Sequence, residues 1–261
     1  MPGLPGAAPA DVFGDGHVSG YVGRVATYGL VHGAWHDASC WERLTPELEQ
    51  RGHRVIAVDL PCDDPSATFS TYADLVVGAL KGEQDIVLVG HSVAGLTIPI
   101  AAASLPVRRL IFLCALIASP GRSFLEQLEE DPEMLFPGYQ AGLSEADAHL
   151  RRWVDFELAR EILYADCDEP IAKRALERLR PQALTPYGEP CPLDELPQVE
   201  RAYIVCSGDR LVNPSGLAAQ SPTGSGSSRS SFRAATRRSS PVPPTSPTCW
   251  TRIPDPRSYR F

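Results

Sequence analysis

Residues 85–95 read Asp-Ile-Val-Leu-Val-Gly-His-Ser-Val-Ala-Gly, and this stretch decides the fold. Ile86 to Val89 form a short unbroken apolar run, which is typical of a strand covered on both faces in a parallel sheet. Leu96 to Ala103 then has the pattern of a helix. Ser92 lies between the two. The sequence therefore predicts that a strand, a tight turn and a helix meet at a serine.

This order of elements is that of a nucleophile elbow, in which a serine occupies a strained turn. The turn needs small residues two positions before and two positions after the serine, because strand and helix approach closely there. Gly90 and Ala94 occupy these positions, and Gly95 keeps the turn small. A Gly-x-Ser-x-small pattern also occurs by chance, but the flanking strand and helix favour the catalytic interpretation. We therefore predict Ser92 as the nucleophile.

Composition limits the remaining possibilities. The chain has 261 residues, of which 43% are hydrophobic, which suffices for one α/β domain with an inserted subdomain. No apolar run reaches the ~18 residues of a membrane span, and the first residues lack a secretory pattern. The net charge of -8 argues against a nucleic-acid partner, because such binding depends on basic patches. The seven cysteines lack a CxxC pair, which predicts reduced core thiols in a cytoplasmic protein. Oligomeric state is not indicated.

Strand and helix patterns alternate along most of the chain, which predicts an α/β fold with a doubly wound, mostly parallel sheet. Strands are expected at 25–31, 54–60, 86–89, 109–116 and 202–206, and helices at 36–50, 72–80 and 96–103. The expected domain organisation is an unstructured extension over 1–24, core over 25–119, an inserted helical cap over 120–197, core again over 198–216, and a disordered tail over 217–261.

The best-marked helix of the cap begins near Asp168. This residue is a candidate N-cap, and Pro170 suits the first helical turn. The apolar residues that then share one face are Ile171, Ala175, Leu176 and Leu179. We expect this face to pack within a cap that lies over the sheet.

A serine hydroxyl is a poor nucleophile near neutral pH and needs a base, usually a histidine that a carboxylate orients. Asp209 follows the strand predicted at 202–206, at the carboxyl end of the sheet, where such an acid belongs. Aspartate in a Gly-Asp turn is often only a turn former. Its place after a returning strand favours the catalytic role.

The loop after the first strand, His32-Gly-Ala-Trp-His36, is a candidate oxyanion loop. Two backbone donors are needed, one from this loop and one from the residue after the nucleophile, and Ala34 and Val93 fit. Gly33 and His91 are expected to border the substrate pocket. His32 and His36 have a spacing seen in zinc sites, but no further ligand set is visible, so we predict no metal.

Five motifs between Val25 and Pro214 together resemble one family, the α/β-hydrolases, and within it the plant-type methyl esterases and hydroxynitrile lyases with their bacterial relatives. They are Leu30-Val-His-Gly-Ala-Trp-His36, Gly52-His-Arg-Val-Ile-Ala-Val-Asp-Leu60, Val89-Gly-His-Ser92, Leu179-Arg-Pro181 and Tyr203-Ile-Val-Cys-Ser-Gly-Asp209.

The resemblance implies an acyl-enzyme route on a small-molecule ester, without a cofactor. It implies Ser92 as nucleophile, Asp209 as acid, and Ala34 and Val93 as oxyanion donors. In the lyase members a threonine stands where this chain has Gly33, so the esterase side of the branch is favoured.

The family pattern also requires a histidine after the acid, and this chain has none. Its six histidines, at 17, 32, 36, 53, 91 and 149, all precede Asp209. Residues 217–261 are rich in serine and proline and carry seven arginines against one acidic residue, which predicts disorder. This segment is either a basic tail for a partner or, in our preferred hypothesis, the product of a reading-frame shift near Ser215.

We therefore expect a serine carboxylesterase that is impaired because the triad histidine is absent. Two alternatives stay open. The chain could be a non-catalytic ligand-binding scaffold of the same fold, or a hydroxynitrile lyase.

Overall fold

The computed structural model describes residues 25–147, 149–206, 208–213 and 233–235. Its main sheet has six strands in the order β2-β1-β3-β4-β8-β9, and all of its pairings are parallel. The strands are β1 (Thr27–Val31), β2 (Arg54–Val58), β3 (Ile86–His91), β4 (Val107–Leu113), β8 (Glu200–Ile204) and β9 (Arg233–Ala235). The predicted α/β class with a mostly parallel sheet is confirmed.

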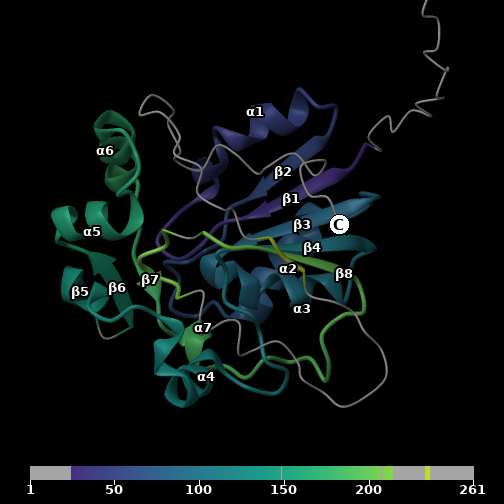
Figure 1. Cartoon of the computed structure of the whole chain (residues 1–261). Coiled ribbons are helices and arrows are strands. Elements are labelled where there is room, and N and C mark those ends of the chain that lie inside the picture. The colour runs from purple at the N-terminus through teal and green to yellow at the C-terminus, as the bar shows by residue number, and fades with distance from the viewer. Residues whose placement is uncertain (1–24, 148, 207, 214–232, 236–261) are drawn as a thin grey trace, which may run out of the picture.

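Helices lie on both faces of this sheet (Figure 1). The helices α2 (Phe69–Ala79) and α3 (Ile98–Ala102) cover one face, and α1 (Leu44–Glu49) lies on the other. In β3, Ile86 and Leu88 pack in the cluster that includes α2 and α3, whereas Val87 and Val89 pack in the cluster that includes α1. A strand buried on both faces explains why its sequence is an unbroken apolar run.

Residues 36–50, predicted as one helix, form two shorter elements. The 3-10 helix η1 (Ala38–Trp41) is followed by α1. Asp37 caps η1 by accepting a hydrogen bond from the Ser39 amide at 2.8 Å. Pro46 lies in the first turn of α1 and has no N–H, so the bond to the Glu42 carbonyl that one continuous helix would need cannot form.

The sequence predicts a helical cap over residues 120–197. In the structure this segment is not wholly helical, because it also contains strands. It contains α4 (Phe124–Glu130), η3 (Pro132–Met134), η4 (Tyr139–Gly142), α5 (Phe156–Leu163), α6 (Glu169–Glu177), α7 (Thr185–Gly188) and an antiparallel sheet of β5 (Leu143–Asp147), β6 (Leu150–Trp153) and β7 (Gln182–Ala183). The three strands are short and largely polar, so they carry no apolar alternation that the sequence could reveal.

Helix α6 agrees with its prediction. Asp168 is the N-cap residue, although its side chain makes no capping hydrogen bond, and a proline occupies the first turn. The four apolar residues predicted to share a face pack around a buried cluster that contains Ala172 and Tyr164. In Figure 1 this helix and α5 lie at one end of the molecule, beside the main sheet.

The predicted extension over 1–24 lies outside the described residues, as does most of the predicted tail over 217–261. Arg233–Ala235 is the described part of that tail, and it forms β9. Its register with β8 runs from Ala202↔Arg233 to Ile204↔Ala235. The sequence predicts disorder throughout this segment, and at these three residues the structure instead has a strand of the main sheet.

The prediction of reduced thiols is wrong for Cys114 and Cys206, which form a disulfide with their Cα atoms 5.8 Å apart. Cys167 is also disulfide-bonded. Leu113 pairs with Ile204 in register, so the residues just beyond these two strands lie side by side. Their sequence separation of 92 hides this proximity.

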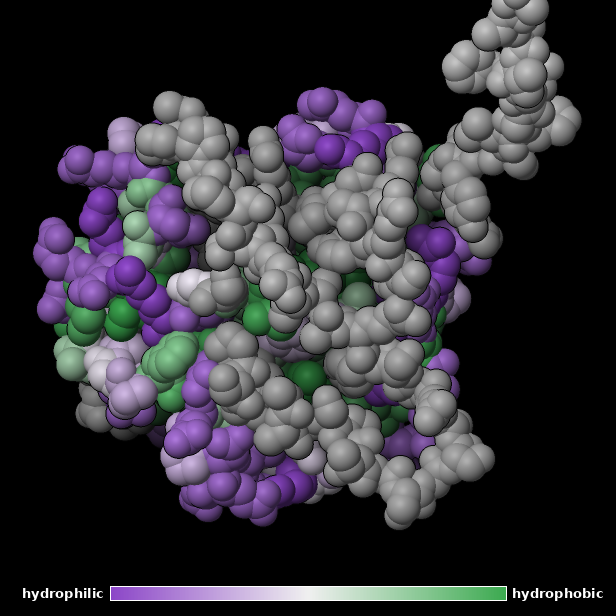
Figure 2. All heavy atoms as spheres, in the orientation of Figure 1, coloured by the Kyte–Doolittle hydropathy of each residue, from purple (hydrophilic) through white to green (hydrophobic). Residues whose placement is uncertain are grey.

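Hydrophilic residues cover the outer sides of α1 and α4 on the face shown in Figure 2. Among the helices that the structure describes, we find none with the length and apolarity that crossing a bilayer would require.

Candidate active site

Ser92 has the backbone conformation of a strained turn. It follows β3 directly, begins the 3-10 helix η2 (Ser92–Leu96), and has φ of 52°. Residues other than glycine rarely adopt this left-handed region, and such strain clusters at functional sites. The Ser92 carbonyl accepts a hydrogen bond from the Leu116 amide at 3.0 Å, which ties the turn to the segment after β4.

The glycines around Ser92 are required by close packing. A Cβ on Gly90 would lie 3.0 Å from the carbonyl carbon and oxygen of Ala94, and 2.9 Å from Ile98 Cδ1. A Cβ on Gly95 would lie 1.9 Å from the carbonyl oxygen of Leu116. The strand and the following helix thus approach as closely as the sequence pattern predicted.

The loop after β1 lies directly against this turn. A Cβ on Gly33 would lie 2.9 Å from Ser92 Cβ and 2.8 Å from His91 Nδ1. Ala34 follows Gly33 along the chain, and Val93 follows Ser92. These two residues are 7% and 5% exposed. The loop that carries Ala34 therefore lies against the turn that carries Ser92 and Val93, and the oxyanion role of the two amides stays a prediction.

Two histidines, the buried His32 and the half-buried His36, support the loop through its carbonyl groups. His32 Nδ1 donates to Gly33 O at 2.8 Å, and its Nε2 accepts from the Leu60 amide at 2.9 Å. His36 Nδ1 donates to Ala34 O at 2.7 Å, and its Nε2 accepts from the Tyr164 hydroxyl at 2.8 Å. These contacts fix neutral tautomers.

Burial agrees with neutral rings, because it lowers the pKa of His32 to about 4 and also lowers the pKa of His36. Within the described part of the chain, no group of three potential ligands could hold a metal ion. In the structure, His32 and His36, whose spacing is seen in zinc sites, each hydrogen-bond a carbonyl group of the loop.

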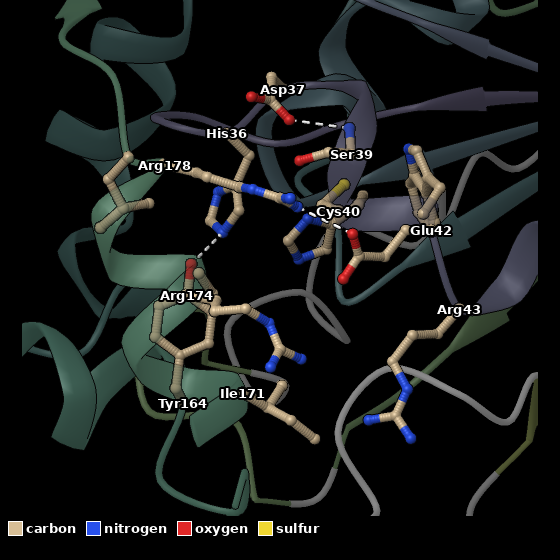
Figure 3. Close-up of a pocket in the computed structure, with 14 residues that line it drawn as sticks. His36, Asp37, Ser39, Cys40, Glu42, Arg43, Tyr164, Ile171, Arg174 and Arg178 are labelled. Atoms are coloured by element: carbon tan, nitrogen blue, oxygen red, sulfur yellow. Dashed lines mark hydrogen bonds and ion pairs between the residues drawn. The ribbon is translucent and has the colours of Figure 1, made fainter. Parts of the chain in front are cut away.

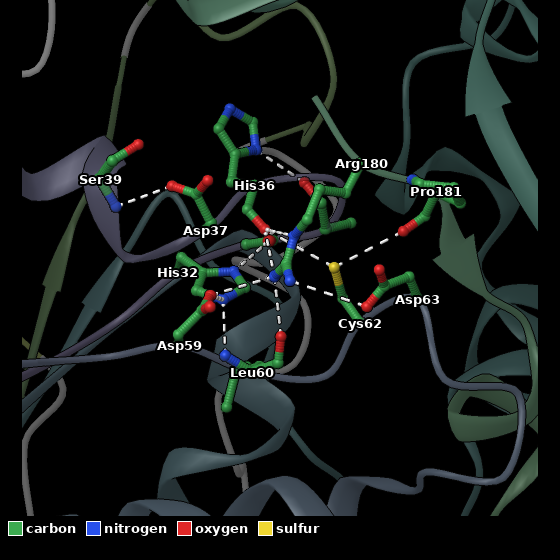
Figure 4. A network of polar contacts seen from close by, with 12 residues as sticks. His32, His36, Asp37, Ser39, Asp59, Leu60, Cys62, Asp63, Arg180 and Pro181 are labelled. Carbon is green, nitrogen blue, oxygen red and sulfur yellow. Dashed lines mark hydrogen bonds and ion pairs between the residues drawn. The ribbon is translucent and has the colours of Figure 1, made fainter. Parts of the chain in front are cut away.

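Arg180, which follows α6 in the cap, hydrogen-bonds the loop that follows β1 (Figure 4). Its Nη2 lies 2.9 Å from His36 O, 2.8 Å from Leu60 O and 3.1 Å from Asp59 Oδ1. The Arg180 amide also donates to Trp35 O at 2.8 Å. One side chain therefore joins the oxyanion loop, the end of β2 and the cap.

Asp209 lies beyond the carboxyl end of β8, and this is the end of the sheet that also carries Ser92, because β3, β4 and β8 are parallel neighbours. Its Oδ1 accepts from the amides of Leu211 at 2.8 Å and Val212 at 2.9 Å. Burial raises the pKa of this carboxyl despite those two hydrogen bonds. Among the described contacts of Asp209 there is no imidazole, so its role as a triad acid stays a prediction.

His91, predicted to border the substrate pocket, lines a cavity of about 70 Å³ between η1 and α6, whereas Gly33 does not line it. Burial lowers the pKa of His91 well below its ordinary value. The cap residues of this cavity, such as Tyr164 and Arg174, carry no motif, and the sequence offered no signal that would have found them.

A parallel sheet with a strained serine turn at the end of β3, facing a glycine loop after β1, defines the α/β-hydrolase class. The model of the alpha/beta hydrolase family matches residues 30–251, and the chain belongs to this family. It is a carboxylesterase-like member. The match passes residue 216, and so gives no support to the prediction that the resemblance stops before the tail.

Individual relatives agree with the predicted branch. The chain is 38% identical over 90 residues to methylesterase 3 of Arabidopsis thaliana, covering 30% of this chain and 34% of the relative. It is 35% identical over 121 residues to the alpha-hydroxynitrile lyase of the same plant, covering 42% and 46%. A pyrethroid hydrolase from Sphingobium faniae has a similar structure, with a TM-score of 0.59, 26% identity, and coverage of 75% and 83%.

Proposed function

We propose that this site hydrolyses carboxylic esters of small molecules through an acyl-enzyme on Ser92. The observation that carries the proposal is the left-handed turn at Ser92 with the Gly33 loop packed against it. Strain of this kind exposes a serine oxygen at the top of the sheet, and two nearby amides can then stabilise an oxyanion. The relatives that are esterases and hydrolases support the same reaction class.

In the proposed reaction Ser92 Oγ attacks the ester carbonyl carbon while its proton passes to a base. The amides of Ala34 and Val93 donate to the oxyanion, the alcohol leaves with a proton, and water then releases the acid from the serine. Asp209 is proposed to orient the base. Because no histidine follows Asp209 in this sequence, we expect turnover to be impaired by a factor of up to about 10⁶.

The proposal is tested by labelling with a fluorophosphonate and by hydrolysis of p-nitrophenyl acetate. We expect labelling of the chain to be slow, because the base is missing, to be lost in Ser92→Ala, and to be retained in Ser66→Ala, which removes an exposed serine hydroxyl elsewhere. A second protein, expressed from a gene whose reading frame is shifted back after Ser215, should hydrolyse the ester faster. Labelling that persists in Ser92→Ala would reject Ser92 as the nucleophile.

A non-catalytic scaffold is the alternative that a specific observation favours. The Asp209 carboxylate is occupied by amides of its own turn, and no histidine follows it in the sequence. Absence of both labelling and ester hydrolysis, in this chain and in the frame-shifted protein alike, would support this alternative. Release of cyanide from a cyanohydrin would instead support the lyase, against the argument from Gly33.

The cytoplasmic location stays a prediction. It depended on reduced thiols, and disulfides such as Cys114–Cys206 persist mainly in oxidising compartments. Fractionation of the cells that make the protein would show whether it lies in the cytoplasm or in an oxidising compartment.

A further inference from the structure

The oxyanion loop over residues 32–36 contains a second strained turn besides that of Ser92. Trp35 has φ of 64°, in the left-handed region that a bulky residue rarely adopts. Such a conformation persists only where the surrounding contacts hold it. Trp35 follows Ala34 directly. The contacts that hold this turn therefore also hold the backbone next to the proposed oxyanion donor.

The two peptide groups on either side of Trp35 are both hydrogen-bonded through their carbonyl oxygens. The first joins Ala34 to Trp35, and the Ala34 carbonyl accepts from His36 Nδ1 at 2.7 Å. The second joins Trp35 to His36, and the Trp35 carbonyl accepts from the Arg180 amide at 2.8 Å. Arg180 is a cap residue, so the cap holds the second peptide group directly.

The first peptide group is also tied to the cap, through the ring of His36. A carbonyl oxygen can only accept, so the Nδ1 atom that contacts Ala34 O must carry a proton. Desolvation lowers the pKa of His36, which leaves the ring neutral and its Nε2 atom an acceptor. The Tyr164 hydroxyl lies 2.8 Å from this Nε2 atom and donates to it (Figure 3).

Tyr164 thereby selects the tautomer of His36. Which ring nitrogen carries the proton is set by the hydrogen bond that the other nitrogen makes. The alternative tautomer would place the lone pair of Nδ1 against the Ala34 carbonyl oxygen. Tyr164 is itself fixed, because it is 2% exposed and packs in a cluster of the cap that contains Ala172. Its hydroxyl is therefore held at the His36 ring.

We propose that Tyr164 is a positioning residue of the active site. By fixing the tautomer of His36, it holds the left-handed turn at Trp35 and, with it, the Ala34 amide. The effect on rate rests on the proposed esterase function, in which this amide binds the oxyanion. The hydrogen bonds from Tyr164 to His36 and from His36 to Ala34 do not depend on that reaction, so they can be tested without it.

The first test reads the tautomer from ¹⁵N–¹H spectra of the histidine rings in the full chain, where His36→Asn identifies the His36 signals. We expect the Nδ1–H form in the parent chain. Tyr164→Phe keeps the aromatic ring and removes the hydroxyl. In this variant the Nε2–H form should appear, and the backbone amide resonances of Ala34 and Trp35 should shift, because the contact with the Ala34 carbonyl is lost.

The second test measures how fast a fluorophosphonate labels Ser92 in the full chain. Tyr164→Phe should lower the maximal rate about tenfold, because an oxyanion donor is displaced. The reagent concentration that gives half of this rate should stay within about twofold, since reversible binding is unaffected. The matched control is Tyr187→Phe in the cap, where the ring contacts Phe69 and Phe124 instead. It should change neither the rate nor the His36 signals.

A double variant separates positioning from a general structural loss. The amide of His36→Asn can donate to the Ala34 carbonyl without help from Tyr164. In that background Tyr164→Phe should slow labelling by less than about twofold, because the two residues act as one unit. A tenfold loss in both backgrounds would overturn the proposal, as would an unchanged tautomer or an unchanged rate in Tyr164→Phe. Labelling that is absent, or that persists in Ser92→Ala, would instead count against the esterase proposal, and the tautomer and amide resonances would still decide the role of Tyr164.

Discussion

Gly95 makes the serine turn possible because it has no side chain. Its position faces the Leu116 carbonyl, and a Cβ there would lie 1.9 Å from that oxygen. We expect Gly95→Ala to lower the free energy of unfolding by about 2–4 kcal/mol, because backbone must move to relieve the overlap. Denaturation in urea measures this change.

The matched control is Gly78→Ala in α2, where a Cβ would meet nothing within 4 Å. This substitution should raise the free energy of unfolding by about 0.5–1 kcal/mol, the helix-propensity difference between the two residues. Equal effects of the two substitutions would contradict the close approach at Gly95.

His32 should make stability depend on pH. Its pKa is about 4 in the folded chain and near 6.5 when unfolded, so the unfolded state binds more protons between these values. The contribution of the neutral ring is fully present above pH 6.5 and is lost as the pH falls toward 4, by about 3 kcal/mol. Urea denaturation at a series of pH values should show this slope.

His32→Gln provides the comparison, because an amide can also donate to one partner and accept from another. The pH dependence should be weaker in this variant. An unchanged slope would assign the effect to other groups whose pKa is also lowered in the folded chain, such as His36 and His91.

The residues of the serine turn could be predicted because their roles are local. Ser92, Gly90 and Gly95 are recognised from their spacing, and the strain at Ser92 follows from that spacing. The hydrogen bond between His36 and Tyr164 could not be predicted, since it joins residues 128 positions apart and neither belongs to a pattern that names the other.

Arg180 joins the cap to the oxyanion loop and to the segment after β2. Its planar guanidinium reaches two carbonyls and a carboxylate at once, which a lysine ammonium cannot reproduce. Arg180→Lys should lower the free energy of unfolding by about 1–3 kcal/mol, because a partly buried network loses bonds. Arg178→Lys, which alters an exposed pair with Glu42, should cost less than about 1 kcal/mol. If urea denaturation shows comparable losses in the free energy of unfolding for the two variants, Arg180 does not hold the cap to the oxyanion loop.

Elements of the core were predictable and those of the cap were less so. Apolar runs mark β3 and β4, because both faces of these strands are buried. Strand β7 has two residues and is defined by pairing with β6, a contact between segments distant in sequence. Such strands depend on tertiary pairing rather than on local pattern.

For the whole molecule, the strand order β2-β1-β3-β4-β8-β9 carries information that the sequence hides. The cap separates β4 from β8 along the chain, yet the two strands are neighbours in the sheet. This neighbourhood joins Cys114 to Cys206 and brings the turn of Asp209, whose amide donates to Cys206 O at 3.1 Å, beside the segment that supports Ser92.

The Cys114–Cys206 bond should contribute strongly to global stability, because it closes a long loop with a sequence separation of 92. Loop-closure entropy in the unfolded chain predicts that Cys114→Ala with Cys206→Ala lowers the free energy of unfolding by about 4 kcal/mol. Urea denaturation without reductant measures this loss. Cys191→Ala, which alters a buried cysteine that forms no disulfide, should cost less. If the double variant unfolds at the same urea concentration as the parent chain, the bond does not restrain the unfolded state, and the two strand ends are held together by packing alone.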